Sequence, residues 1–156
     1  ILACDTDPVR LQRLQPRAQR AGATIIEAIG DPYGERLTRE INGAADVVFV
    51  DAPCSGSGTW RRNPESKWTL DEGRLAGYRA AQRQLVERAA ALLKPSGVLV
   101  YAVCSIFSEE HLAPLGLDGW GAESQEFLTP GRSNTDGFFV ARLRRREMLA
   151  PKLLRS

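Results

Sequence analysis

The stretch Ala-Ala-Asp-Val-Val-Phe-Val-Asp-Ala-Pro-Cys-Ser-Gly-Ser-Gly, residues 44–58, decides the fold class. Its apolar, β-branched run Val47–Val50 predicts a buried strand, and a loop of Pro, Ser and Gly follows it. A second such run, Val98–Tyr101, precedes Cys104. Because a helical pattern separates the two runs, we expect parallel strands of an α/β sheet, with Cys54 and Cys104 at the sheet edge where such folds bind ligands.

The rest of the chain extends this alternation of strands and helices. A proline inside the first helix, Pro16, should kink or shorten that helix. The segment 52–69 is expected to be one long functional loop, and a glycine-rich link should precede the last strand. Together the patterns predict a doubly wound, mostly parallel sheet. The further strands are expected at 1–4, 24–29 and 138–143, and the helices at 8–21, 33–41, 70–93 and 108–115.

Composition describes an ordinary globular domain. The chain has 156 residues, 43% of them hydrophobic, and a net charge of +2. It lacks an apolar run of the ~20 residues that span a bilayer and a signal-peptide pattern, so we expect a cytoplasmic protein without membrane contact. The chain starts without Met and inside an expected strand, which we interpret as a fragment whose amino-terminal part is missing.

Three cysteines without close spacing argue against a disulfide framework. There is no Cys-x-x-Cys pair, and His111 is the single histidine, so we expect no structural metal. Cys4, within a strand, is best interpreted as a small hydrophobic residue.

Acidic residues end three successive expected strands: Asp5, Asp31 and Asp51. An acid after the second strand of a Rossmann-like unit commonly binds ribose hydroxyls. Helix capping or turn formation explains Asp31, which precedes Pro32, about equally well.

The carboxyl-terminal stretch 142–156 holds six basic residues and one acidic residue. A basic strip suits a phosphate backbone. On charge alone, a solvated tail is the favoured interpretation.

Five motifs follow one another along the chain: Val-Asp-Ala-Pro-Cys-Ser-Gly-Ser-Gly-Thr (50–59), Arg-Arg-Asn-Pro-Glu-Ser-Lys-Trp (61–68), Leu-Lys-Pro-Ser-Gly (93–97), Tyr-Ala-Val-Cys-Ser-Ile (101–106) and Asp-Gly-Phe-Phe-Val-Ala (136–141). In this order they resemble the RsmB/NSUN family of RNA cytosine carbon-5 methyltransferases, which use S-adenosylmethionine. The resemblance implies a Rossmann-like methyltransferase fold, with a catalytic part at 1–143 and a basic tail at 144–156. The family's glycine-rich cofactor loop, which would precede Asp5, is absent, so we expect an amino-terminally truncated fragment that lacks the first strand and is inactive alone.

The resemblance also implies catalytic roles. Carbon 5 of cytosine is a poor nucleophile until a thiolate adds to carbon 6, which is nucleophilic catalysis. By resemblance, Cys104 is that nucleophile, Cys54 assists release of the methylated product, and Asp51 contacts the ring and the cofactor site. For each cysteine taken singly, core packing is the alternative.

Cofactor and RNA contacts carry over in the same way. Asp5 resembles the acid that holds the ribose hydroxyls, and Asp31 the acid beside the adenine. Arg62 and Lys67 lie in the loop beside the target nucleotide, where the alternative is a solvent-exposed charge. The implied partner is RNA, with ribosomal RNA favoured over transfer RNA, and we expect a monomer.

Two other functions stay open. A catalytically silent RNA-binding remnant would keep the basic residues without a working cofactor site. An amino-group methyltransferase of nucleic acids has an Asp-Pro-Pro-Tyr-like loop in a similar place, but Pro53-Cys54 and the second cysteine, Cys104, argue against it.

Overall fold

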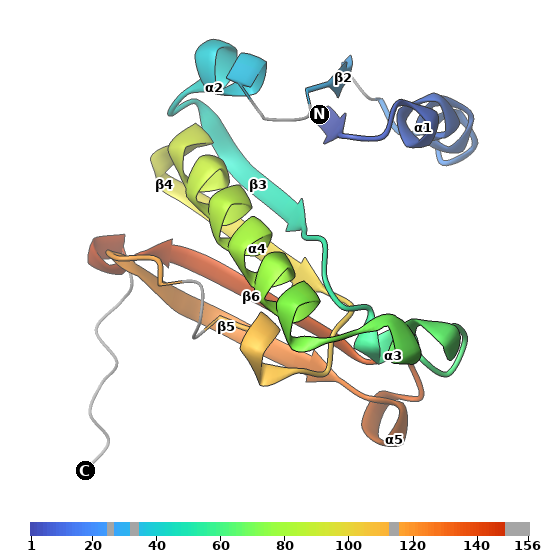
Figure 1. The fold of residues 1–156 in the computed structure, drawn as a ribbon. Helices are drawn as coiled ribbons and strands as arrows, with labels where there is room; N and C mark the ends of the chain where they lie inside the picture. The colour runs from blue at the N-terminus through green and yellow to red at the C-terminus, as the bar shows by residue number, and fades with distance from the viewer. Residues whose placement is uncertain (25–26, 32–34, 113–115, 149–156) are drawn as a thin grey trace. The chain divides into compact units, whose positions relative to one another are not determined.

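The computed structural model describes residues 1–24, 27–31, 35–112 and 116–148 (Figure 1). The chain forms two compact units, Ile1–Asn42 and Gly43–Ser156. Within the described ranges, no helix has the length and apolar character needed to cross a membrane.

The first unit is a small α/β element. Its strands β1 (Leu2–Asp5) and β2 (Glu27–Gly30) pair in parallel, with Asp5 opposite Gly30. Helix α1 (Pro8–Arg20) connects them, and α2 (Glu35–Ile41) follows β2. The expected order of strands and helices is therefore confirmed here, although residues 25–26 and 33–34 of the expected elements lie outside the described residues.

Helix α1 begins and ends as the sequence predicts. Asp7 caps it by accepting a hydrogen bond from the Val9 amide at 2.8 Å, and Gly22 follows its end with a φ of +62°. The expectation that Pro16 would kink or shorten the helix was wrong in one respect, because α1 continues past Pro16 to Arg20. A proline removes one backbone hydrogen bond, and the turns on either side keep theirs.

The second unit contains a four-stranded sheet in the order β3-β4-β6-β5. Strands β3 (Ala45–Asp51) and β4 (Leu93–Val103) are parallel, whereas β6 (Phe138–Arg145) runs antiparallel to both β4 and β5 (Trp120–Leu128). The α/β, Rossmann-like class is confirmed. The sheet is mixed, because its last two strands form an antiparallel pair.

Strand β5 corrects the prediction of a glycine-rich link between residue 115 and the last strand. Its central residues are polar, so it lacks the apolar alternation that identifies a strand. Backbone pairing with β6 holds it there, together with ion pairs from Glu123 to Arg142 and Arg144 across the two strands.

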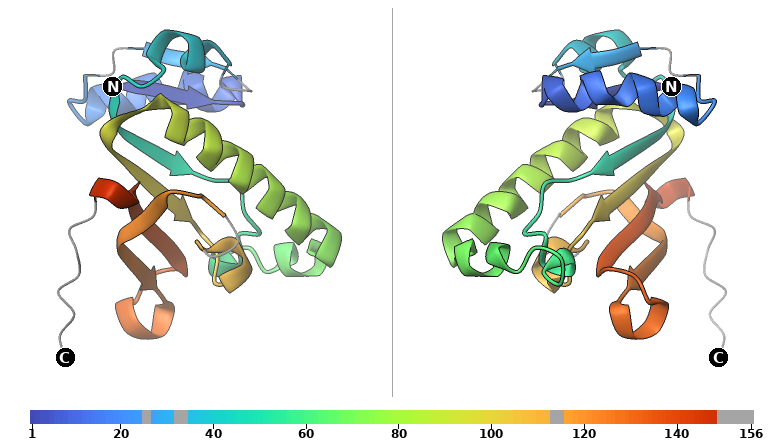
Figure 2. Two further views of the ribbon diagram at one scale, coloured as in Figure 1. Left: turned by 90° about the vertical axis from the view of Figure 1, so that its left-hand side faces the viewer. Right: turned by 90° about the vertical axis from the view of Figure 1, so that its right-hand side faces the viewer.

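Helix α4 (Glu72–Leu92) lies across one face of β3 and β4 (Figures 1 and 2). Asp71 caps it by accepting from the Arg74 amide at 2.8 Å. Its buried Val86, Ala89 and Ala90 join the core formed by the inward face of the sheet. The helix confirms the prediction for 70–93. Residues 94–97, which follow the predicted helix, belong to β4 as an irregular insertion between its pairings with Ala45 and Val47.

The expected long loop at 52–69 is partly helical. It contains η1 (Ser57–Thr59) and α3 (Glu65–Thr69). Short polar contacts stabilise it, such as the Thr59 hydroxyl donating to the Gly56 carbonyl oxygen at 2.8 Å. Three more short helices occur in the described ranges: η2 (Ser108–Glu110), α5 (Pro130–Ser133) and η4 (Arg146–Met148). Of the helix predicted at 108–115, only η2 is present, and residues 113–115 lie outside the described residues.

Candidate active site

The parallel pairing of β3 and β4 brings the two predicted thiols together. Asp51 is the last residue of β3 and lies opposite Ala102 of β4, so the loops carrying Cys54 and Cys104 leave the sheet side by side. The Sγ atoms of Cys54 and Cys104 are 3.4 Å apart and both cysteines are free. Both thiols are partly exposed, and Cys54 also packs against the hydrophobic core.

The two thiols are not equivalent. The hydrogen bond with Cys54 lowers the pKa of Cys104 to about 7, against burial and the negative charges of Asp51 and Glu110. The same hydrogen bond, followed by burial, raises the pKa of Cys54 far above its ordinary value. These opposite directions favour Cys104 as the thiolate of the pair and Cys54 as the hydrogen-bond donor.

Asp51 lies within electrostatic reach of the thiolate. Its charge is one of the causes that raise the pKa of Cys104. Its side chain is exposed at the end of β3, where it is open to a ligand. The structure thus brings three predicted site residues to the same edge of the sheet: Asp51, Cys54 and Cys104.

Gly58 forms a backbone bridge beneath the cysteines that the sequence pattern did not reveal. Its N–H donates to the Cys104 carbonyl oxygen at 3.0 Å, and its own carbonyl oxygen accepts from the Gly137 N–H at 2.9 Å. A Cβ atom at position 58 would lie 1.9 Å from the Gly137 oxygen. Only glycine allows this approach of three chain segments.

Sequence reasoning also missed Glu110, a completely buried carboxylate. Its Oε1 accepts from the Ser55 N–H at 2.8 Å and from Gln82 Nε2 at 3.1 Å. Its Oε2 accepts from the hydroxyls of Ser55 and Ser105. One feature of the sequence could have pointed to this network: both loop cysteines are followed directly by a serine, as Cys54-Ser55 and Cys104-Ser105.

Aromatic residues support this network from the sheet. The Tyr101 hydroxyl donates to the Glu110 carbonyl oxygen at 2.8 Å. The His111 ring stacks on Phe139 with centroids 4.1 Å apart, and its Nε2 lies 3.3 Å from the Ser105 carbonyl oxygen. The loop after Cys104 is therefore fixed from both sides.

The two predicted cofactor acids of the first unit end its parallel strands. Asp5 accepts from the Asp7 amide at 2.8 Å, with Arg10 3.8 Å away. Asp31 accepts from the amides of Glu35 at 3.1 Å and Leu37 at 3.0 Å. The contacts of Asp31 are those of the capping alternative, and a cofactor role for either acid stays a prediction.

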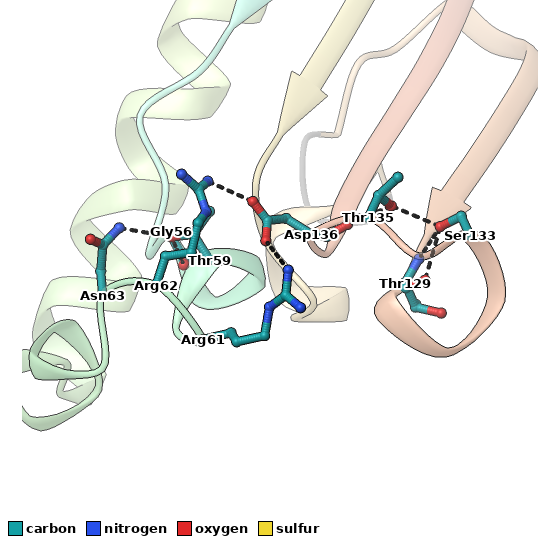
Figure 3. A network of polar contacts seen from close by, with 9 residues as sticks. All are labelled: Gly56, Thr59, Arg61, Arg62, Asn63, Thr129, Ser133, Thr135 and Asp136. Carbon is teal, nitrogen blue, oxygen red and sulfur yellow. Dashed lines mark hydrogen bonds and ion pairs between the residues drawn. The ribbon is translucent and has the colours of Figure 1, made fainter.

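The two predicted RNA-contacting residues lie on the exposed segment after η1. Arg62 Nη2 lies 2.5 Å from Asp136 Oδ2, and Arg61 contacts the same carboxylate at 3.8 Å. Figure 3 shows both guanidinium groups directed at Asp136. Lys67 lies 5.8 Å from the ring centroid of Trp68, an indole that is 84% exposed.

The basic stretch begins inside the sheet rather than in a tail. The side chain of Arg144 pairs with Glu123, and Arg145 lies 5.2 Å from the Trp120 ring centroid. Residues 149–156 lie outside the described part of the chain. Among the residues that are described, no group of three His, Cys, Asp or Glu side chains could hold a metal ion.

Comparisons with known proteins agree with this geometry. A family model described as 16S rRNA methyltransferase RsmB/F matches residues 1–117. Ribosomal RNA small subunit methyltransferase B of Shewanella oneidensis is 33% identical over 165 residues, covering 92% of this chain and 37% of that protein. The same enzyme of Salmonella arizonae is 33% identical over 156 residues, covering 92% and 36%. The chain thus spans a little over a third of the length of these relatives.

Solved structures share the fold. The crystal structure of PH0851 has a TM-score of 0.82 at 34% identity, and the match covers 93% of this chain and 37% of the PH0851 chain. NSun6 from Pyrococcus horikoshii, solved with SFG, has a TM-score of 0.80 at 23% identity, covering 93% and 41%. With a family match over residues 1–117 and relatives of 33% identity, the chain belongs to the 16S rRNA methyltransferase RsmB/F family.

Proposed function

We propose that the protein is an S-adenosylmethionine-dependent RNA methyltransferase that modifies carbon 5 of cytosine through a covalent bond between Cys104 and the base. The observation that carries this proposal is the contact of Cys54 and Cys104 at 3.4 Å, with opposite pKa shifts. Membership of the RsmB/F family supports the RNA substrate.

The proposed chemistry begins at Cys104. Its thiolate forms a bond to carbon 6, and the electron pair of the 5,6 double bond moves into the ring, toward carbon 5 and nitrogen 3. Asp51 contacts the ring at nitrogen 3, where a proton held between the two groups neutralises the charge that develops. Carbon 5 is then nucleophilic and takes a methyl group.

Release requires loss of the carbon-5 proton. As that proton leaves, its bonding pair re-forms the 5,6 double bond, and the bond from carbon 6 to sulfur breaks to return the Cys104 thiolate. The hydrogen bond to Cys104 is the largest cause that raises the pKa of Cys54. Once Cys104 is bonded to the base this cause is gone and the pKa of Cys54 falls, so Cys54 can release its own proton to solvent and then accept the carbon-5 proton as a thiolate.

The residues at the ends of β1 and β2 fit S-adenosylmethionine by their chemistry. Carboxylates accept hydrogen bonds from ribose hydroxyls and from an adenine amino group. Asp5 would hold the ribose and Asp31 the adenine, each already fixed by backbone amides. When bound, S-adenosylmethionine would supply the methyl group, and its sulfonium sulfur would keep the bonding pair and leave as a neutral thioether. SFG, found with NSun6, is an analogue of it.

The substrate we propose is a cytosine of ribosomal RNA, unpaired or flipped out, because carbon 6 is not accessible within a stacked helix. Arg62 and Lys67 contact phosphates beside the target in this proposal. A monomer in the cytoplasm suffices for such a reaction.

The decisive experiment uses the complete gene product and an RNA that contains 5-azacytosine, from which the enzyme cannot be released. We expect a denaturation-resistant protein–RNA adduct that Cys104→Ser abolishes. Cys4→Ser is the matched control and should retain the adduct. An adduct that survives Cys104→Ser would contradict the nucleophile. RNA binding without any adduct or methyl transfer would support the silent remnant.

A further inference from the structure

We propose that Glu110 is a positioning residue that clasps the two Cys-Ser loops to one carboxylate and so holds the Sγ atoms of Cys54 and Cys104 in contact. The inference deepens the proposed function and rests on it only for the use made of the thiol pair. The clasp itself involves neither RNA nor cofactor.

Each loop binds the carboxylate through the residue next to its cysteine. Ser55 donates twice, from its N–H at 2.8 Å to Oε1 and from its hydroxyl to Oε2. Ser105 donates its hydroxyl to the same Oε2. Since these serines follow Cys54 and Cys104 directly, a displacement of the carboxylate would displace the backbone beside both thiols.

Two further side chains tighten the clasp. Gln82 of α4 donates from Nε2 to Glu110 at 3.1 Å and to the Pro53 carbonyl oxygen at 2.9 Å. Ser57 accepts from the Ile106 N–H at 3.0 Å, and its hydroxyl lies 3.0 Å from that of Ser105. These polar contacts join the loops after β3 and β4, together with the edge-to-face packing of Trp60 on Phe107, whose ring centroids are 5.6 Å apart.

The burial of Glu110 makes the clasp rigid. Its side chain is 0% exposed, and a buried carboxylate is tolerated only when it is hydrogen-bonded. Four donors meet its two oxygens. Separating the loops would remove some of these donors from a buried carboxylate, which costs free energy. Glu110 is itself fixed, because its N–H donates to the Phe107 carbonyl oxygen at 3.1 Å and its carbonyl oxygen accepts from Tyr101.

A structural role alone would change only stability, so the test needs a readout at the thiols. The groups acting on Cys104 are Cys54, Asp51 and Glu110: the first lowers its pKa and the two acids raise it. Removing the charge of Glu110 without moving the loops therefore lowers the pKa of Cys104. Separating the thiols raises it, because the hydrogen bond from Cys54 is lost.

The experiment measures the rate of Cys104 alkylation by iodoacetamide against pH in the complete gene product, with the modified cysteine identified by peptide mass spectrometry. We expect Glu110→Ala to raise the midpoint by about one pH unit, which is about tenfold slower alkylation at low pH. Glu110→Gln keeps the clasp, because the glutamine amide group can donate to the serine hydroxyls, which also accept hydrogen bonds. The alkylation midpoint of this variant should stay at or below that of the wild-type protein.

Leu143→Ala is the matched control. Leu143 is buried in β6 opposite Leu99, away from the cysteine end of β4, so the variant should lose thermal stability without a change in the midpoint. A folded Glu110→Ala variant whose midpoint does not rise would overturn the proposal. So would an equal rise in Glu110→Gln or Leu143→Ala.

If Glu110→Ala does not fold, Ser105→Ala is measured instead, because this variant removes one of the hydroxyl groups that donate to Glu110 Oε2. Its midpoint should also rise, and an unchanged midpoint would overturn the clasp. Alkylation requires no substrate, so failure here is distinct from failure of the proposed function, which is the absence of a Cys104-dependent RNA adduct.

Discussion

The backbone N–H of Gly58 donates a hydrogen bond to the carbonyl oxygen of Cys104 at 3.0 Å. This bond joins the loop after β3 to the residue proposed as the nucleophile. Gly137 donates to Gly58 from the other side, so the segment before β6 is part of the same arrangement. Positions of the reacting groups thus depend on close contact between three backbone segments.

Gly58→Ala should disrupt this arrangement. The added Cβ would lie 1.9 Å from the Gly137 oxygen, and since this atom belongs to the backbone, the backbone of one segment must shift. We expect a loss of about 3 kcal/mol or more in the free energy of unfolding, at the upper end of overpacking effects. Urea denaturation measures it.

Gly77→Ala is the control for that change. Gly77 lies within α4, where a Cβ meets nothing within 4 Å. Alanine should stabilise the helix there by about 0.5–1 kcal/mol. Equal stability losses at positions 58 and 77 would contradict the steric argument.

Alkylation of Cys104 should follow its thiolate fraction. With a pKa of about 7, the rate rises as pH increases through 7 and levels off above it, whereas an ordinary cysteine needs a pH well above 8. Cys54→Ala removes the hydrogen bond that lowers this pKa, so the midpoint should move upward. A downward move would show that Cys54 does not donate to Cys104.

Cys54→Ala should also stall the reaction on ordinary RNA. Addition through Cys104 continues, but release slows because the proposed proton acceptor is absent. We expect a slowly migrating protein–RNA band on denaturing gels that thiol reductants do not remove. The Cys54→Ala, Cys104→Ser double variant should show none, and its persistence there would place the bond on another residue.

Arg62 and Asp136 should have opposite effects on RNA affinity. Arg62→Ala removes a cation, so binding should weaken and the slope of log affinity against log salt should fall by about one. Asp136→Asn releases Arg61 and Arg62 from their shared carboxylate and should strengthen binding. Filter binding at several salt concentrations measures both. Weaker RNA binding by Asp136→Asn would mean that the ion pairs hold Arg61 and Arg62 in the conformation that binds RNA.

The sequence by itself determined the α/β class and the positions of Asp51, Cys54 and Cys104 after two apolar strands. These features are local: run length, β-branching and the residues that end a run. Helix α4 was predictable for the same reason, since its apolar spacing and the Asp71 cap are contained in one segment. Strand β5 was not, because its polar residues are held by pairing with β6.

Only the tertiary structure decided which polar groups support the thiols. Glu110 follows another glutamate, and nothing local distinguishes the exposed Glu109 from the buried Glu110 until η2 packs against both cysteine loops. The need for glycine at position 58 arises from Gly137, and the charge environment of Arg62 from Asp136. Contacts between distant segments carry no local pattern, so they appear only when folding brings those segments together.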